Sequence, residues 1–354
     1  MITTILAFVF VLGVLIFIHE LGHFLVAKWV GIGVERFSVG FPPYIFNFRR
    51  GGTDYSIGLL PLGGFVKMKG ENPDEETTGE ADEFMSKSVG QRAAVIFAGP
   101  FMNYLLAIFL MIGILYFGGR PVYDEDRSVV GTVVDEGPAA EAGIEPGDQI
   151  IAVDGQVVTS FDSMRELINA KVEEPITVTW VRGSDTISAT TTTTTGQQPT
   201  PEGKIDTVGM IGISQQILAY EDFGLVESVE RGFVGAHVMV YKTVEFVYLL
   251  ISGQVSSKMI GGPLFIAQQS GKEAEQGASR LFLFMALLSV NLAVLNVLPI
   301  PILDGGHLVF LAIEKIKGSP LSVRARGLAQ QIGLIVLLSL IIFVTYNDIM
   351  RVFQ

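Results

Sequence analysis

Four apolar runs dominate the hydrophobicity pattern of this chain. They cover about Ile5 to Val30, Ala93 to Phe117, Leu281 to Ile302 and Ile332 to Tyr346. A helix needs roughly 20 apolar residues to cross a bilayer, and the last run reaches this length only when Gly327 to Gln331 is included. The pattern predicts four transmembrane helices.

The first run begins near the N-terminus, where a cleaved signal peptide is the alternative. No basic residue precedes Lys28 and no clear small-residue cleavage site follows the run, so the features of a signal peptide are missing. We therefore expect a retained membrane helix.

A further apolar stretch, from Val226 to Gln254, differs from these runs because His237, Lys242 and Glu245 interrupt it. We interpret it as an amphipathic helix at the membrane interface. If it crossed the bilayer, the last two runs and the basic link between them would be inverted relative to the first two.

Composition supports a membrane protein. Hydrophobic residues make up 49% of the 354 residues and charged residues only 17%, against about 25% charged residues in an average soluble protein. The chain has no cysteine, which excludes disulfides, thiolate nucleophiles and cysteine-ligated zinc. Any metal must be held by His, Asp, Glu, Asn or water.

Charge is unevenly distributed along the chain. The segment from Gly119 to Arg280 contains 11 basic and 23 acidic residues, which accounts for the whole net charge of -12 and argues against a nucleic-acid partner. Basic residues gather between Lys28 and Arg92 and between Lys315 and Arg326. The positive-inside rule makes these two segments cytoplasmic. The acidic segment and both termini are then extracytoplasmic.

Residues 119–225 have the pattern of a small β-rich domain with two short helices. "GPAAEAGIEPGDQIIAVDG" predicts a short helix, a turn and the strand Gln149 to Val153. In "FDSMRELINA", Phe161, Met164, Leu167 and Ile168 fall on one helical face. "PITVTWVR" and "TISATTTTTT" predict a hairpin of β-branched residues. "TTTTTTGQQPTPEG" predicts an edge strand that runs into a polar linker.

The candidate chemistry lies inside the first apolar run, where "FIHELGHF" carries three polar side chains. His19 and His23 are four residues apart, so in a helix they point from the same face and suit one metal ion. Glu20 can reach a water at that metal without being a ligand, and can act as a general base. On its own, however, the motif also occurs by chance in proteins that bind no metal.

The place of this motif in a membrane helix strengthens the metal interpretation. A charged residue near the bilayer centre costs about 2.5 to 3.5 kcal/mol, so such residues persist where they pair, bind or line a wet cavity. The alternative is that these are core residues whose polar groups are hydrogen-bonded within the protein. That explanation suits one buried histidine better than it suits His19, Glu20 and His23 together.

Catalytic zinc usually has three protein ligands and an open position. We predict Asp304 as the third ligand, because it is the only acidic residue in or beside the third run. Pro299 and Pro301 break the helix there and free backbone groups that need a wet or protein-lined cavity. The alternative is an aspartate solvated at the C-terminal end of that helix.

These motifs resemble the site-2 protease family of intramembrane zinc metalloproteases. The resemblance rests on "HELGH" in the first run, "AGPFMNYLLA" in the second and "NVLPIPILDGG" at the end of the third, and it covers nearly the whole chain. It implies that His19, His23 and Asp304 bind one zinc ion and that Glu20 is the general base.

The resemblance also implies substrate contacts. "VGFPPYIFNFRRGGTDYSIGLLPLGGFVKMKG" is similar to the family's membrane-associated β-loop, which holds an unwound substrate as an added strand. A purely structural hairpin is the alternative. The candidate substrate-binding residues are Gly63, Gly64, Phe65, Asn296 and Pro299. For Asn296, and for Asn103 in the second run, ordinary interhelical hydrogen bonding is the alternative.

The central domain is similar to a PDZ domain of the bacterial, permuted type, which implies a groove for a peptide strand or C-terminus. A β-rich spacer without a ligand is the alternative. Only one such domain fits between Pro121 and about Leu225, whereas relatives that control sigma factors have two in tandem. This departure leaves gating by a PDZ pair, and an anti-sigma-factor substrate, open.

We therefore predict a multi-pass α-helical protein of a bacterial inner membrane, with four transmembrane helices, a β-loop, one extracytoplasmic PDZ domain and an active site toward the cytoplasmic side. Its expected parts are a first membrane half (1–118), a PDZ domain with linker (119–225), an interfacial connector (226–280) and a second membrane half (281–354).

The predicted function is intramembrane zinc endoproteolysis of single-span membrane proteins, such as anti-sigma factors or signal-peptide remnants, in regulated intramembrane proteolysis. The expected partners are these substrates, membrane lipid and a peptide C-terminus at the PDZ domain. A non-catalytic membrane adaptor that binds peptide C-termini through that domain is the alternative.

Overall fold

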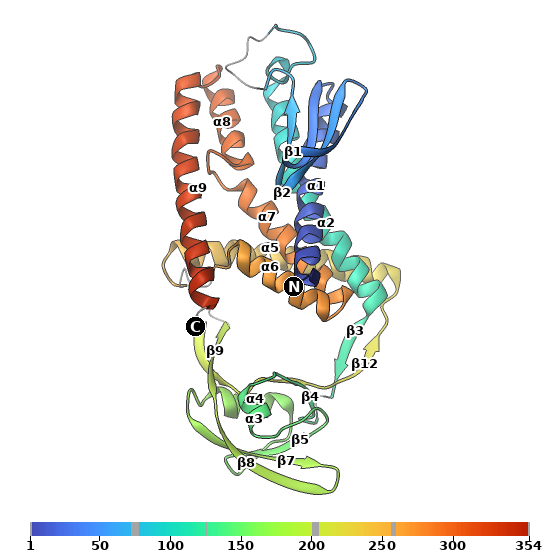
Figure 1. The fold of residues 1–354 in the computed structure, drawn as a ribbon, viewed down its shortest axis with the longest axis vertical. Coiled ribbons are helices and arrows are strands. Elements are labelled where there is room, and N and C mark those ends of the chain that lie inside the picture. The colour runs from blue at the N-terminus through green and yellow to red at the C-terminus, as the bar shows by residue number, and fades with distance from the viewer. Residues whose placement is uncertain (1, 72–77, 125, 200–204, 256–259, 353–354) are drawn as a thin grey trace. The chain divides into compact units, whose positions relative to one another are not determined.

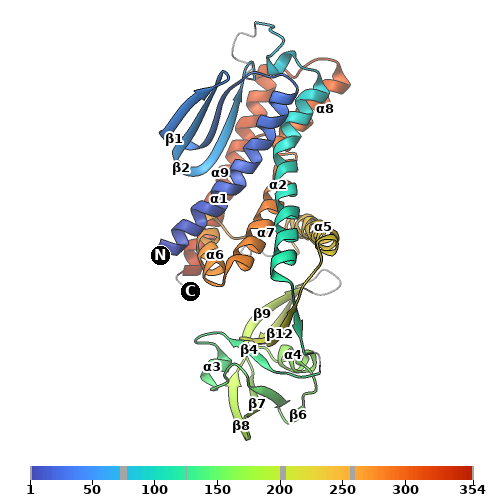
Figure 2. The same ribbon diagram turned by 90° about the vertical axis from the view of Figure 1, so that its right-hand side faces the viewer.

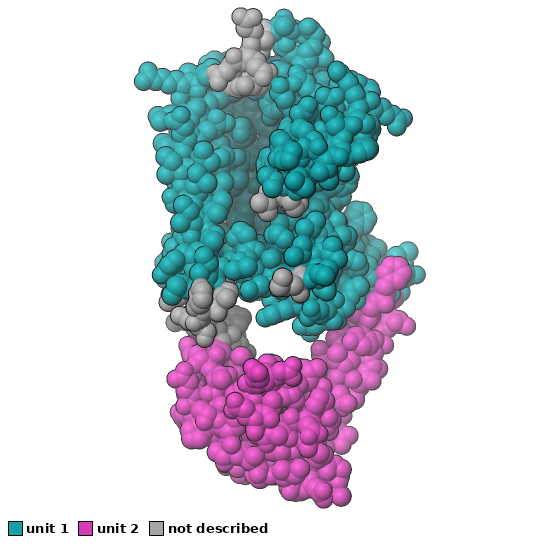
Figure 3. All heavy atoms as spheres, viewed as in Figure 1, with its two compact units in different colours: residues 1–116, 224–354 teal, residues 117–223 magenta. Residues whose placement is uncertain are grey.

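The computed structural model describes residues 2–352 except 72–77, 125, 200–204 and 256–259. These residues form two compact units (Figure 3). The helical unit comprises residues 1–116 and 224–354, and the β-rich unit comprises residues 117–223. Each unit is described separately below.

The helical unit contains long helices and one twisted β-hairpin (Figure 1). Its elements are α1 (Ile2–Trp29), β1 (Val34–Arg50), β2 (Thr53–Met68), η1 (Phe84–Ser86), α2 (Val89–Gly118), α5 (Leu225–Ile251), α6 (Pro263–Glu275), α7 (Ala278–Val297), α8 (Asp304–Lys317) and α9 (Val323–Val352). Five of these helices, α1, α2, α5, α7 and α9, are long and apolar enough to cross a membrane.

Four of the five helices correspond to the four predicted apolar runs, and α5 is the additional one. Figures 1 and 2 show that α5 lies crosswise to α1, α2 and α9, which run along the long axis of the helical unit. The polar interruptions predicted to set α5 apart are present on it, where Lys242 pairs with Glu245 at 2.8 Å. Helix α9, Val323–Val352, is longer at both ends than the predicted fourth run, even when Gly327 to Gln331 is included in that run.

The third apolar run is shorter as a helix than predicted, and this changes the place of Asp304. Helix α7 ends at Val297, and Leu298 is already extended. Pro299 and Pro301 follow, and proline cannot donate to a helical hydrogen-bond ladder. The chain turns and restarts as α8 with Asp304 as its first helical residue. Asp304 therefore lies at the start of a new helix, and its interpretation as a solvated group at the end of the third run is wrong.

The predicted β-loop is the hairpin β1–β2, and β2 folds around β1. Residues 36–39 of β1 have partners in both 54–57 and 64–67 of β2. Residues 64–68 therefore pair along one edge only, and no other described strand pairs with their second edge. An open edge of this kind can accept an additional strand.

One apolar core fixes the elements that carry the polar motifs. Buried side chains from α1, β1, β2, α2 and α8 pack together in it, namely Ala27, Phe37, Val66, Val95 and Leu311. Segments distant in sequence are thereby held around the "HELGH" turn of α1.

The β-rich unit contains short strands and two short helices (Figure 2). Its elements are β3 (Arg120–Tyr123), β4 (Val130–Val133), α3 (Pro138–Glu141), β5 (Gln149–Val153), β6 (Gln156–Val157), α4 (Phe161–Asn169), β7 (Pro175–Arg182), β8 (Asp185–Thr192), β9 (Thr194–Pro199), β10 (Ile205–Met210), β11 (Ile213–Gln215) and β12 (Ile217–Glu221). Strands β6-β5-β7-β8 form one sheet, and β10-β9, β11-β4 and β12-β3 form pairs.

Most local predictions for this unit are confirmed. The predicted strand Gln149 to Val153 is β5, and the predicted apolar face of α4 belongs to the same buried core as Trp180, which is 1% exposed. The predicted hairpin is β7–β8. The prediction of a polar linker after the edge strand is wrong for Gly196 to Pro199, which belong to β9 and pair with β10. Residues 200–204 lie outside the described residues.

Candidate metal centre

Helix α1 presents His19 and His23 from one face, as their spacing predicts. Their Nε2 atoms lie 3.2 Å apart, and both side chains are buried. Buried residues such as Val11 and Leu15 continue the same face toward the N-terminus, so α1 is packed against the protein along the side that carries the histidines. The two imidazoles are thereby directed into the helical unit.

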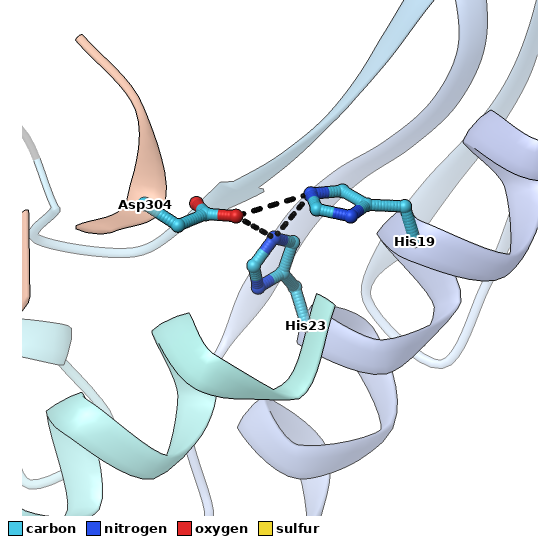
Figure 4. A group of neighbouring side chains, drawn as sticks. All are labelled: His19, His23 and Asp304. Atoms are coloured by element: carbon cyan, nitrogen blue, oxygen red, sulfur yellow. Dashed lines mark hydrogen bonds and ion pairs between the residues drawn. The ribbon is translucent and has the colours of Figure 1, made fainter. Parts of the chain in front are cut away.

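Asp304 completes a three-residue group (Figure 4). Its Oδ2 lies 3.2 Å from Nε2 of His19 and 3.6 Å from Nε2 of His23. The carboxylate comes from the first turn of α8, so the proline break after α7 is what lets it reach the imidazoles. The three ligand atoms all lie within 4.8 Å of one another.

Helix α2 fixes the outer side of His23. The Nδ1 of His23 donates to the backbone oxygen of Val95 at 2.8 Å, which leaves the Nε2 lone pair free for a metal. Gly99 makes this approach possible, because an added Cβ there would lie 2.4 Å from His23 Nε2 and 2.9 Å from His19 Cε1. Any larger residue would push α2 away from both imidazoles.

A second residue of α2 contacts His19. Asn103 is fully buried, and its amide nitrogen lies 3.2 Å from Nδ1 of His19. Sequence analysis singled out Asn103 only as an amide within an apolar run. Its contact with a ligand histidine could be found only from the packing of α1 against α2.

The residues present fit a zinc ion. Oδ2 of Asp304 is buried without a hydrogen-bond partner among the described residues, and it faces two imidazole nitrogens whose rings are held on their far sides. Zinc sites with catalytic function use three such nitrogen and oxygen ligands and keep one position open. A divalent cation would compensate the negative charge of this buried carboxylate.

The metal group opens into a cavity of about 420 Å³. Glu20 lines this cavity one residue from His19, and Gly64 of β2 packs on it, because a Cβ at Gly64 would lie 3.0 Å from Cγ of Glu20. Residues 64–66 and Met68 of β2 therefore line the same cavity as the predicted base and the metal group. The lining residues are His19, Glu20, His23, Gly64, Phe65, Val66, Met68, Glu71, Phe84, Ile96, Asp304, His307, Arg326 and Gln330.

The predicted substrate-binding residues divide into two groups. Gly64 and Phe65 line the cavity, and Gly63 lies beside them against the ring of Phe41. Asn296 is half-buried on α7 and Pro299 is exposed after it. These last two are not among the described residues that line the cavity.

Sequence analysis did not assign a site role to four polar residues that line the cavity, namely Glu71, His307, Arg326 and Gln330. His307 follows Asp304 by one helical turn, which is a signal that sequence could have used. Arg326 and Gln330 come from α9, and only the packing of α9 places them here.

A family model for "Peptidase family M50" matches residues 7–340. The chain belongs to this family. Members are site-2-type zinc metalloproteases, so the chain is a membrane protein and a zinc peptidase by family. Membership of this family does not favour the alternative function, a membrane adaptor without catalytic activity.

Curated relatives support the assignment over the full length. A Rhizobium meliloti protein is 36% identical and covers 98% of this chain and 96% of its own. Proteins named zinc metalloprotease RasP match from Geobacillus kaustophilus at 32% identity, covering 99% of this chain and 98% of the relative, and from Bacillus licheniformis at 30% identity, covering 99% of each.

Among solved structures, the PDZ domain of an SdrC-like protein from Listeria monocytogenes is similar at 24% identity. The similar region covers 27% of this chain and 90% of the Listeria chain, with a TM-score of 0.21.

Proposed function

We propose that this protein is an intramembrane zinc metalloendopeptidase that cleaves the transmembrane segments of single-span membrane proteins. The observation that carries the proposal is the convergence of His19, His23 and Asp304 from two helices in the lining of a cavity that also contains Glu20. The full-length similarity to zinc metalloproteases supports the same activity.

His19, His23 and Asp304 would hold the zinc ion through two Nε2 atoms and one carboxylate oxygen. When bound, zinc supplies a Lewis acid that polarises the scissile carbonyl and acidifies a water molecule. Glu20, which lines the same cavity, accepts a proton from the attacking water. The water oxygen bonds to the carbonyl carbon, the C–N bond breaks, and Glu20 passes the proton to the leaving nitrogen.

The open edge of β2 suits the substrate that this chemistry needs. A transmembrane helix hides its peptide bonds in its own hydrogen-bond ladder, so it must unwind locally before water can attack. An unwound segment that pairs with residues 64–68 satisfies its backbone groups as an added strand. Gly64 and Phe65 then contact the substrate beside Glu20. Asn296 and Pro299 are not among the described residues that line this cavity.

Four membrane crossings fit this function. The crosswise course of α5 in the helical unit supports an interfacial helix (Figure 2), and α1, α2, α7 and α9 then cross the bilayer of a bacterial inner membrane. The basic residues Lys315 and Lys317 at the end of α8 support a cytoplasmic position for the α8–α9 link. The metal group, at the start of α8, would lie nearer the cytoplasmic face.

The β-rich unit offers a second recognition surface. A groove of about 470 Å³ lies between α4 and residues 208–214, with Phe161, Met164 and Ile168 on its helical wall. A peptide end would lie in this groove as an added strand beside residues 208–214 and would insert an apolar side chain against α4. Binding there selects substrates whose extracytoplasmic part has already been shortened.

The test uses the purified protein in proteoliposomes with a single-span reporter. Glu20→Gln should bind stoichiometric zinc, measured by elemental analysis, and lose cleavage of the reporter. Glu227→Gln is the matched control, because Glu227 is an exposed carboxylate on α5 that pairs with Arg231. It should keep both properties. Full cleavage by Glu20→Gln, or wild-type protein without zinc, would refute the mechanism.

A further inference from the structure

The contact between Asn103 and His19 contains an inconsistency of hydrogen-bond roles. The amide nitrogen of Asn103 lies 3.2 Å from Nδ1 of His19. The amide oxygen, Oδ1, is buried and has no hydrogen-bond partner among the described residues. An amide nitrogen can only donate, so the contact is satisfied only if Nδ1 of His19 is an acceptor.

The metal site requires the opposite role for Nδ1. Nε2 of His19 faces Asp304 and His23, so it must present its lone pair to a cation. A neutral imidazole carries one proton, which must then lie on Nδ1. In this orientation of the Asn103 amide, its N–H₂ group and the Nδ1–H of His19 are two donors that face each other.

Rotation of the amide by 180° removes this conflict. The oxygen and nitrogen of an asparagine amide are nearly equivalent in shape, and their assignment follows from the hydrogen-bond network. After the rotation Oδ1 accepts from Nδ1–H of His19. The amide N–H₂ takes the former place of Oδ1, and a repulsive contact is exchanged for a hydrogen bond.

We propose that Asn103 is a positioning residue that accepts a hydrogen bond from Nδ1–H of His19 and thereby selects the His19 tautomer that binds zinc. The inference rests on the proposed function of this site. With this hydrogen bond, both ligand histidines donate from Nδ1 and keep Nε2 for the metal, since His23 donates from Nδ1 to the backbone oxygen of Val95 at 2.8 Å.

The backbone of Asn103 is itself held in place. Ser289 of α7 donates from its hydroxyl to the backbone oxygen of Asn103 at 2.7 Å, and both residues are buried. Gly99, one turn earlier on α2, lies against both imidazoles. One face of α2 therefore orients both nitrogen ligands, and α7 anchors that face.

Three variants of the full-length protein separate the roles that Asn103 could have. Asn103→Leu keeps the approximate size and removes the acceptor. Asn103→Asp keeps an acceptor and removes the donor. Asn291→Leu is the matched control, because Asn291 is also an amide in an apolar helix, accepts from Thr243 at 2.8 Å, and is neither in the metal group nor among the described residues that line the cavity.

The measurements are the zinc dissociation constant, by competition with a chelator, and the visible absorption spectrum of the cobalt-substituted protein. Loss of an outer partner of a metal-bound histidine typically lowers metal affinity about 10- to 100-fold. We expect that loss, with a changed cobalt spectrum, for Asn103→Leu. Asn103→Asp and Asn291→Leu should stay within a few-fold of wild type.

Two results would overturn the inference: wild-type zinc affinity in folded Asn103→Leu, or a loss in Asn103→Asp as large as in Asn103→Leu. If Asn103→Leu does not fold, Asn103→Asp decides, since a donor role predicts its failure and an acceptor role its retention of zinc. Absence of zinc from the wild-type protein would instead refute the proposed function, so the two failures are distinguishable.

Discussion

Arg92 on α2 and Glu314 on α8 form a buried, bidentate ion pair. The two guanidinium nitrogens donate to the two carboxylate oxygens at 2.5 and 3.1 Å, and the side chains are only 5% and 9% exposed. Helix α8 begins with Asp304 and α2 carries the partners of His19 and His23. The ion pair therefore joins the helix of the carboxylate ligand to the helix that orients the imidazoles.

We expect Arg92→Leu to destabilise the protein by about 3 to 5 kcal/mol, because it leaves Glu314 charged and buried. Arg326, which lies 3.8 Å from Glu314, compensates only partly. The double variant Arg92→Leu/Glu314→Leu should recover part of the loss. Urea titration of the three proteins in detergent measures this, and additive effects of the two changes would contradict a coupled pair.

Gly99→Ala should weaken zinc binding although it replaces no ligand residue. The added Cβ would lie 2.4 Å from His23 Nε2, so α2 or the imidazole must shift. Gly113→Ala, on the same helix, is the control because no atom lies within 4 Å of its added Cβ. We expect zinc affinity to fall in the first variant and not in the second, as measured by chelator competition. Equal affinities would show that α2 does not set the ligand geometry.

Asp304 and His307 lie one turn apart on α8 and both line the cavity, but only Asp304 belongs to the metal group. Asp304→Ala should lose its equivalent of zinc, as should His23→Ala. His307→Gln should keep it. Elemental analysis of the purified variants decides, and loss of zinc from His307→Gln would mean that the ligand set is larger than three residues.

The β-rich unit should lose stability in acid through Asp148. Burial of Asp148 favours its neutral form, but hydrogen bonds from Arg182, both at 2.8 Å, outweigh burial and hold the pKa of this carboxyl below its usual range. A depressed folded pKa contributes stability above the unfolded pKa of about 3.9, and this stability is lost as pH falls through the folded pKa.

Asp148→Asn should lower the stability of this unit at neutral pH and weaken its dependence on pH below about 4. Trp180 is buried in the unit, and Trp29 is the only other tryptophan and is exposed. In a Trp29→Phe background, the fluorescence of Trp180 therefore follows this unit alone. An unchanged acid transition in Asp148→Asn would exclude Asp148 as its source.

Local pattern was sufficient for much of this protein. The apolar runs predicted α1, α2, α7 and α9, and the four-residue spacing of His19 and His23 placed both on one face, because helical periodicity is a property of the chain alone. The strands and the apolar face of α4 in the β-rich unit followed from the same kind of signal.

Tertiary packing decided the rest, because it depends on which helix faces approach each other. Asp304 could be nominated as an acid beside an apolar run, but its position 3.2 Å from His19 follows from the proline break and the restart at α8. The contact of Asn103 with His19 and the crosswise course of α5 (Figure 1) join segments far apart in sequence. Sequence by itself determined which residues could bind a metal, and only the packing of α1, α2 and α8 brought them to one point, since no local periodicity encodes the distance between two helices.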